Sequence, residues 1–209
     1  MPKLAFLPQR LPQGFSDGLG RTVARTGLTP NAISLIGLAG NATAAWLVTR
    51  EQLLAAGIVF LVFSAVDMVD GAVARATGQA TPFGAVFDAV LDRVSEALLL
   101  AGCAWYFADR GEQVQVAVTY AALFGSVAVS YMRARAEVVG LTMREGLFRR
   151  QERVVLISAG LLFNGLTAVI WPLAVLTNLT ALQRFWLIAR GLRRMDKTRD
   201  EGRGTRDDA

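Results

Sequence analysis

Apolar residues in this chain occur in long uncharged blocks that short polar stretches separate. A membrane-spanning helix needs about 20 largely apolar residues, and the blocks reach that length once a few internal charges are included. We predict six transmembrane helices, at approximately residues 32–49, 53–74, 82–107, 113–135, 152–166 and 168–190. The pattern therefore predicts an all-α, polytopic membrane protein with one membrane domain over residues 32–192.

The segments on either side of this domain have a different character. Residues 1–31 are predicted to form an N-terminal interfacial segment, because Gln13 to Thr26 mixes polar and apolar positions as an amphipathic surface helix does. Residues 193–209 are charged and lack apolar periodicity, so a disordered tail is expected there.

The distribution of positive charge predicts how the helices cross the membrane. Of the 22 Lys and Arg residues, only Arg50 and Arg110 fall on the side opposite the N-terminus. Cytoplasmic loops carry an excess of Lys and Arg, so both termini are expected to be cytosolic in a multi-pass protein of the plasma membrane. The same cations attract anionic headgroups, which makes membrane lipids expected partners. No nucleic-acid partner is predicted.

Four aspartates lie at the cytosolic ends of the second and third predicted helices. Asp67 and Asp70 are three residues apart and Asp88 and Asp92 are four apart, so each pair projects from one helix face. One such Asp costs roughly 2.5–3.5 kcal/mol to insert, and four would cost on the order of 10 kcal/mol without a cation. A single intramembrane carboxylate is often a helix contact or a proton-relay group. Four at this spacing indicate an oxygen-ligand site for Mg²⁺ or Mn²⁺.

Other residue types narrow the chemistry of this site. The chain has no histidine and a single cysteine, Cys103, so acid–base chemistry falls to Asp, Glu, Lys or Tyr, and no zinc motif can form. Gly71 and Gly84 would let a backbone or a phosphate approach closely. Arg75 could bind a phosphate oxygen in bidentate fashion.

The acidic segment resembles the signature of the CDP-alcohol phosphatidyltransferases, and every fixed position is present: Asp67-x2-Asp70-Gly71-x2-Ala74-Arg75-x8-Gly84-x3-Asp88-x3-Asp92. The resemblance implies transfer of a phosphatidyl group from CDP-diacylglycerol to an alcohol, with release of CMP. It implies two divalent ions, Mg²⁺ or Mn²⁺, with Asp67, Asp70, Asp88 and Asp92 at the metal site and Asp92 as the general base. It also implies a homodimer and a CDP-lipid site made by Gly71, Arg75 and Thr81 and, with weaker specificity, Pro30, Asn31 and Ser34.

Three arginines suggest that the acceptor carries a phosphate. Arg133 lies at the end of the fourth predicted helix, Arg153 at the start of the fifth, and Arg184 interrupts the sixth, about 6 residues or roughly 9 Å inside its cytosolic end. A buried arginine is costly unless it faces a polar cavity, so we predict that these three bind an acceptor phosphate. Arg144, Arg149 and Arg150 are instead assigned to membrane orientation and headgroup contact.

The surroundings of these arginines resemble one subgroup of the family. Ser130 to Glu137, Glu152-Arg153 and Gln183-Arg184 are similar to the phosphatidylinositol-phosphate synthases of actinobacteria and their archaeal counterparts, which implies inositol phosphate as acceptor. The chain departs from that pattern at Arg133, often a lysine, and at Gln151, commonly a proline. The first change keeps the charge and alters its geometry, and the second affects a helix start.

Three alternatives remain at this stage. A phosphatidylglycerophosphate synthase, which uses glycerol 3-phosphate, would need the same cations. An intramembrane prenyltransferase also binds Mg²⁺ and a diphosphate through aspartates, but those motifs usually lie on separated helix pairs. A cation-coupled transporter would need polar residues toward both faces of the membrane, whereas here they gather at one.

Overall fold

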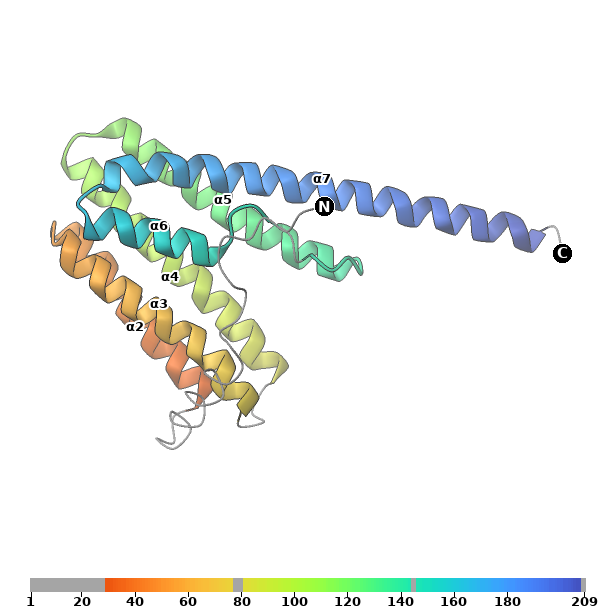
Figure 1. The fold of residues 1–209 in the computed structure, drawn as a ribbon, viewed down its shortest axis with the longest axis horizontal. Coiled ribbons are helices and arrows are strands. Elements are labelled where there is room, and N and C mark those ends of the chain that lie inside the picture. Colours follow the sequence, from red (N-terminus) through yellow and green to blue (C-terminus); the bar gives the residue numbers. More distant parts are fainter. Residues whose placement is uncertain (1–28, 77–80, 144–145, 208–209) are drawn as a thin grey trace.

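The computed structural model describes residues 29–76, 81–143 and 146–207, with side chains described outside 68–76 and 196–207. Within these ranges the secondary structure is entirely helical (Figure 1), as the apolar pattern predicts. The predicted amphipathic helix at Gln13 to Thr26 lies outside the described residues.

Among the described residues, six helices follow the predicted order, with bounds within a few residues of those expected, apart from the end of the last. They are α2 (Pro30–Thr49), α3 (Leu53–Ala76), α4 (Pro82–Asp109), α5 (Gln113–Val138), α6 (Arg150–Leu162) and α7 (Leu166–Asp207). In the described part of the chain, three helices are long and apolar enough to cross a membrane: α2, α5 and the Leu166–Met195 part of α7. The first part of α3, Leu53–Asp67, is a shorter apolar stretch. With its 13 residues α6 is about 20 Å long, less than a bilayer core.

Two helices begin with the same threonine–proline cap. The Thr29 hydroxyl accepts a hydrogen bond from the Ala32 amide at 3.3 Å, and the Thr81 hydroxyl accepts one from the Gly84 amide at 3.0 Å. A proline follows each threonine at the first helical position, where its missing N–H costs nothing. These caps define where α2 and α4 begin, at the end of the bundle that carries the acidic motif.

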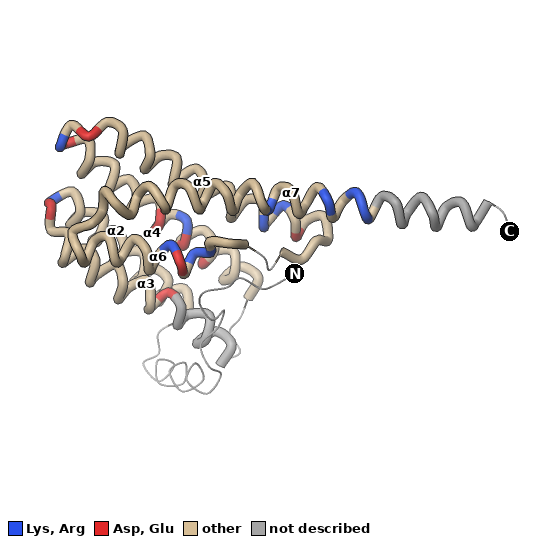
Figure 2. Tube along the Cα trace, turned by 45° about the horizontal axis from the view of Figure 1, so that its top comes forward, with Lys and Arg blue, Asp and Glu red and all other residues tan. Residues whose placement is uncertain are grey.

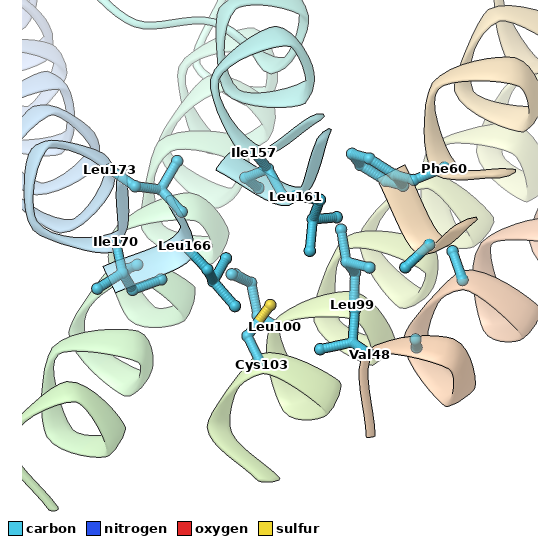
Figure 3. Close-up of a cluster of buried hydrophobic side chains, with 14 of the residues drawn as sticks. Val48, Phe60, Leu99, Leu100, Cys103, Ile157, Leu161, Leu166, Ile170 and Leu173 are labelled. Carbon is cyan, nitrogen blue, oxygen red and sulfur yellow. The ribbon is translucent and has the colours of Figure 1, made fainter. Parts of the chain in front are cut away.

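The helices pack as two groups, α2 with α3 and α4, and α5 with α7, which are joined where α4 lies against α5 and through α6. Helix α2 lies against α3 and α4, α5 lies against α7, and α6 contacts both α3 and α7. Figure 3 shows Leu99 and Leu100 of α4, Ile157 and Leu161 of α6 and Leu173 of α7 pointing into a shared apolar core. This packing orients the polar ends of α3, α4 and α6 toward one another.

Glycines bring α2 unusually close to α3. A Cβ on Gly40 would lie 2.0 Å from the ring of Phe63, and one on Gly37 would lie 1.6 Å from Asp67 Oδ1. Helices approach this closely in membranes where small residues line their interface. The Gly37–Gly40 face of α2 is therefore used within the chain, beside the first aspartate of the motif.

The C-terminal segment is helical in the described part of the chain. We expected disorder from residue 193, but α7 continues without interruption to Asp207 and extends well beyond the other helices (Figure 1). Lengthening an existing helix adds one hydrogen bond for each residue that is ordered, without a new nucleation step. Arg, Lys, Glu and Met favour the helix, and no proline follows Pro172.

Candidate active site

One guanidinium joins two aspartates of the acidic motif. Arg150, the first residue of α6, places Nη2 3.0 Å from Asp67 Oδ2 of α3 and Nη1 2.8 Å from Asp92 Oδ1 of α4. Both carboxylates are shielded from solvent, with side chains 5% and 18% exposed. The two helices therefore direct carboxylate oxygens of Asp67 and Asp92 at a volume small enough for a single cation to touch both.

Helix α2 contributes further groups around Asp67. Asn41 is buried, and its Nδ2 donates a hydrogen bond to Asp67 Oδ2 at 3.4 Å. Gly37, one turn earlier on α2, leaves the space that Asp67 Oδ1 occupies. Neither residue was assigned a site role from the sequence. Their spacing of four, which places both on one face of a helix, was the available signal.

The remaining predicted metal residues are only partly described. Asp88 is half-buried on α4, one turn before Asp92, and close enough to affect it electrostatically. Asp70 lies in the last turns of α3, as do Gly71 and Arg75, and the described part of the chain does not include these side chains. Within the described residues no group of three His, Cys, Asp or Glu side chains converges.

The donor atoms that are described suit a hard divalent cation. Asp67 and Asp92 present carboxylate oxygens, and Asn41 has an amide oxygen that is buried without a hydrogen-bond partner among the described residues. Mg²⁺ and Mn²⁺ prefer such oxygen ligands. The guanidinium that already contacts both carboxylates demonstrates that a positive charge is compatible with this position.

The predicted CDP-lipid residues that are described gather at two neighbouring helix starts. A Cβ on Gly84 of α4 would lie 3.1 Å from Thr81 Oγ1 and 3.4 Å from Asn31 Oδ1 of α2. Ser34, on the next turn of α2, donates a hydrogen bond to the Pro30 carbonyl at 3.2 Å. The starts of α2 and α4 therefore meet at the end of the bundle where Asp88 lies, although they are about 50 residues apart in sequence.

Arg184 is buried where α5, α7 and the loop between α5 and α6 meet. Its side chain is enclosed, and Nη1 donates a hydrogen bond to the Val129 carbonyl at 2.7 Å. A Cβ on Gly146 would lie 2.8 Å from Arg184 Nη2, so the loop backbone approaches the guanidinium closely. The amide of Leu147 donates to Gln183 Oε1 at 3.1 Å, which holds the loop against α7.

Arg153 has a partner that was not predicted from the sequence. It is buried on α6 and donates two hydrogen bonds to Glu96 of α4, Nε to Oε1 at 2.5 Å and Nη2 to Oε2 at 2.9 Å. Glu96 lies one turn after Asp92, directly before the uncharged stretch that begins at Ala97. A carboxylate in such a position was itself a signal of function.

The three predicted acceptor arginines differ in burial. Arg153 and Arg184 are buried and interact electrostatically with each other, and Arg184 also interacts with Arg133 and with Arg149. The Arg133 side chain is 59% exposed and pairs with Glu137 at 3.1 Å. The structure therefore brings the arginines into one electropositive region, with Arg133 at its rim.

The assignment of Arg150 to membrane orientation was wrong. Its guanidinium folds back onto Asp67 and Asp92, which are 83 and 58 positions earlier in the chain. Figure 2 shows acidic and basic positions side by side where α4 and α6 come together, while a separate group of charges lies in the loops at the other end. A charge count along the sequence cannot distinguish a cation that faces headgroups from one that pairs inside the bundle.

Comparison with known proteins identifies the family to which this chain belongs. The family model described as CDP-alcohol phosphatidyltransferase matches residues 27–189, so the chain belongs to the CDP-alcohol phosphatidyltransferase family. Members of this family are membrane-integral transferases that use divalent metals. Membership agrees with the acidic motif and sets aside the prenyltransferase and transporter alternatives.

Three relatives with assigned activities are similar over most of their length. An archaetidylinositol phosphate synthase of Pyrococcus horikoshii is 37% identical, covering 81% of this chain and 88% of that protein. A phosphatidylinositol phosphate synthase of Mycobacteroides abscessus is 37% identical, covering 81% of both chains. The crystal structure of the Mycobacterium tuberculosis phosphatidylinositol phosphate synthase with CDP-DAG bound matches with a TM-score of 0.77, at 32% identity over 84% of this chain and 94% of the other. The same enzyme in complex with manganese and citrate matches with a TM-score of 0.75.

Proposed function

We propose that this protein transfers a phosphatidyl group from CDP-diacylglycerol to inositol phosphate, releasing CMP and forming phosphatidylinositol phosphate. The observation that carries a phosphorylated acceptor is the pair of buried cations, Arg153 and Arg184, and the name of the Mycobacteroides abscessus relative favours inositol phosphate over glycerol 3-phosphate. Buried polar groups need partners, and a phosphorylated acceptor supplies them for Arg153 Nη1 and Arg184 Nε, which have no hydrogen-bond partner among the described residues. The names and bound molecules of the relatives support the same donor and acceptor.

The metal site in this proposal consists of Asp67, Asp70, Asp88 and Asp92. Two divalent ions, Mg²⁺ or Mn²⁺, bound there would neutralise the diphosphate of the donor and stabilise the CMP leaving group. The manganese complex of the Mycobacterium tuberculosis enzyme supports this choice of metal.

Asp92 is the proposed general base. The acceptor hydroxyl gives its proton to the Asp92 carboxylate as its oxygen forms a bond to the phosphorus of the phosphatidyl group, and the bond from that phosphorus to the CMP oxygen breaks. The chain has no histidine, so a carboxylate is the natural base. Arg150 contacts Asp92 at 2.8 Å and must release it before Asp92 can accept a proton freely.

Each substrate has its own set of proposed binding residues. The CDP part of the donor binds at the meeting point of α2, α3 and α4, with contributions from Pro30, Asn31, Ser34, Gly71, Arg75 and Thr81. The acceptor phosphate binds between α5, α6 and α7, through Arg133, Arg153 and Arg184. In this proposal the metal-site aspartates on α3 and α4 act between these two sets, which is the arrangement a direct transfer requires.

The proposed membrane arrangement has six spans within the domain over residues 32–192. Both termini and the active site face the cytosol in the plasma membrane, because the cations cluster at that end. We also propose a homodimer, as the family resemblance implies. The large exposed apolar residues of α4 and α7, Trp105 and Trp171 among them, supply surface for lipid or for a second copy.

The decisive experiment supplies CDP-diacylglycerol and Mn²⁺ or Mg²⁺ to purified protein and compares inositol phosphate, glycerol 3-phosphate and inositol by CMP release. We expect turnover with inositol phosphate and little with inositol. Turnover only with glycerol 3-phosphate would establish a phosphatidylglycerophosphate synthase. If no acceptor releases CMP, the proposed transfer is wrong.

A further inference from the structure

The carboxylate of Glu96 connects three helices inside the bundle. It lies on α4 with 9% of the residue exposed, and both of its oxygens accept hydrogen bonds from Arg153 of α6. The Ser126 side chain of α5 also hydrogen-bonds to it. A buried carboxylate with this many partners is held in one orientation.

The bidentate pair uses only one edge of the Arg153 guanidinium. Nε and Nη2 face Glu96, while Nη1 is buried and has no hydrogen-bond partner among the described residues. Arg184 shows the same division, since Nη1 donates to the Val129 carbonyl whereas Nε is buried without a partner in the described chain. Each guanidinium therefore has at least one nitrogen held by the protein and another without a protein partner that can bind an anion.

Because of the geometry of arginine, fixing two nitrogens of the guanidinium also fixes the direction of the third. The guanidinium is planar with its donors in a rigid fork, so holding Nε and Nη2 determines the direction of Nη1. Glu96 also offsets the repulsion between Arg153 and the nearby Arg184, which interact electrostatically. Without the carboxylate, both the orientation of Arg153 and its closeness to Arg184 would be lost.

We propose that Glu96 is a positioning residue for the acceptor: it fixes Arg153 so that Nη1, together with Arg184 Nε, faces the acceptor phosphate. Glu96 does not itself touch the acceptor. This role rests on the proposed function for the identity of that acceptor. It would make Glu96 a determinant of acceptor binding that belongs to neither the metal site nor the CDP-lipid site.

The first test is Glu96→Gln, which keeps the size of the side chain and removes its charge and one acceptor oxygen. We expect the KM for inositol phosphate to rise about tenfold, in the range for loss of one charge-assisted hydrogen bond. The kcat at saturating acceptor and the KM for CDP-diacylglycerol should stay within about twofold, because uniform acceptor binding is what is lost. Glu96→Asp, which restores the charge on a shorter arm, should fall between the variant and the wild type.

Glu51→Gln is the matched control. Glu51 also pairs with an arginine, Arg110 at 3.0 Å, but its side chain is 55% exposed in the loop at the other end of the helices. The same chemical change there should leave all three kinetic parameters unchanged. If a folded Glu96→Gln protein keeps the wild-type acceptor KM, or if kcat and both KM values change together, the positioning role is overturned.

A binding measurement keeps the inference testable without turnover. Inorganic phosphate should raise the Tm of the wild-type protein in detergent, and the rise should be lost or reduced in Glu96→Gln. If Glu96→Gln does not fold, Glu96→Asp replaces it, because this variant keeps the buried charge. The phosphate-induced Tm rise of Glu96→Asp should be smaller than that of the wild type. An equal rise overturns the positioning role. If phosphate stabilises the wild-type protein but no CMP is released, the proposed transfer is refuted. The role of Glu96 is then tested by the phosphate-induced Tm rise alone.

Discussion

Arg150 Nη1 lies 2.8 Å from Asp92 Oδ1, and the same guanidinium contacts Asp67 through Nη2. A cation belonging to the chain thus occupies the position between two carboxylates that the family motif assigns to metal binding. Arg150 compensates the negative charge that would otherwise be buried there. A divalent ion that binds these same oxygens has to displace it.

Removal of this arginine should therefore tighten metal binding. We expect Arg150→Gln to lower the apparent Kd for Mn²⁺ by about tenfold, equivalent to about 1.4 kcal/mol, because a competing cation is lost. Electron paramagnetic resonance of free Mn²⁺ measures this without turnover. Arg190→Gln, which removes a cation from the exposed part of α7, is the control and should leave the Kd unchanged. Weaker or equal binding in Arg150→Gln would show that the pair does not compete with metal.

Asp92→Asn should separate chemistry from binding. General-base catalysis contributes about 10²–10⁴-fold, so we expect kcat to fall by at least about 10²-fold while the protein still folds and binds CDP-diacylglycerol. CMP release in single-turnover experiments measures the first effect, and equilibrium binding of the donor measures the second. A variant with wild-type kcat would mean that another group accepts the proton.

Gly37→Ala should disturb the site from α2. The added Cβ would lie 1.6 Å from Asp67 Oδ1, so either α2 moves away from α3 or the carboxylate turns. Overpacking of this kind costs about 1–3 kcal/mol, and we expect a lower Tm together with weaker Mn²⁺ binding. Gly165→Ala is the matched control, since nothing lies within 4 Å of a Cβ there. A Gly37→Ala protein with unchanged Tm and Mn²⁺ affinity would contradict the close approach of α2 and α3.

The acceptor arginines should not be equal in effect. Arg184→Ala removes a buried cation, and we expect the KM for inositol phosphate to rise by at least about tenfold, because a charged hydrogen bond contributes about 1.5–3 kcal/mol. Arg133→Ala should have a smaller effect, because its side chain is 59% exposed and already paired with Glu137. Initial rates at varied acceptor and donor concentrations distinguish the two. Effects confined to the KM for CDP-diacylglycerol would reassign these arginines to the donor.

The sequence by itself determined the helices and the acidic motif. The bounds of α2 to α6 follow from apolar blocks, Thr-Pro caps and short loops, all of which are local properties. The spacing of Asp67, Asp70, Asp88 and Asp92 is also local, since residues three or four apart share a helix face. That is why both the fold class and the family could be predicted without coordinates.

The tertiary structure decided which charged groups meet. Arg150 pairs with Asp67 across 83 positions and Arg153 pairs with Glu96 across 57, and no periodicity in the sequence encodes such distances. The sequence analysis assigned Arg150 to lipid headgroups and Arg153 to the acceptor, yet Arg150 faces Asp67 and Asp92, and Arg153 faces Glu96. The packing of α6 between α3 and α7 makes this distinction, because the direction in which a side chain points depends on the neighbours that its helix contacts.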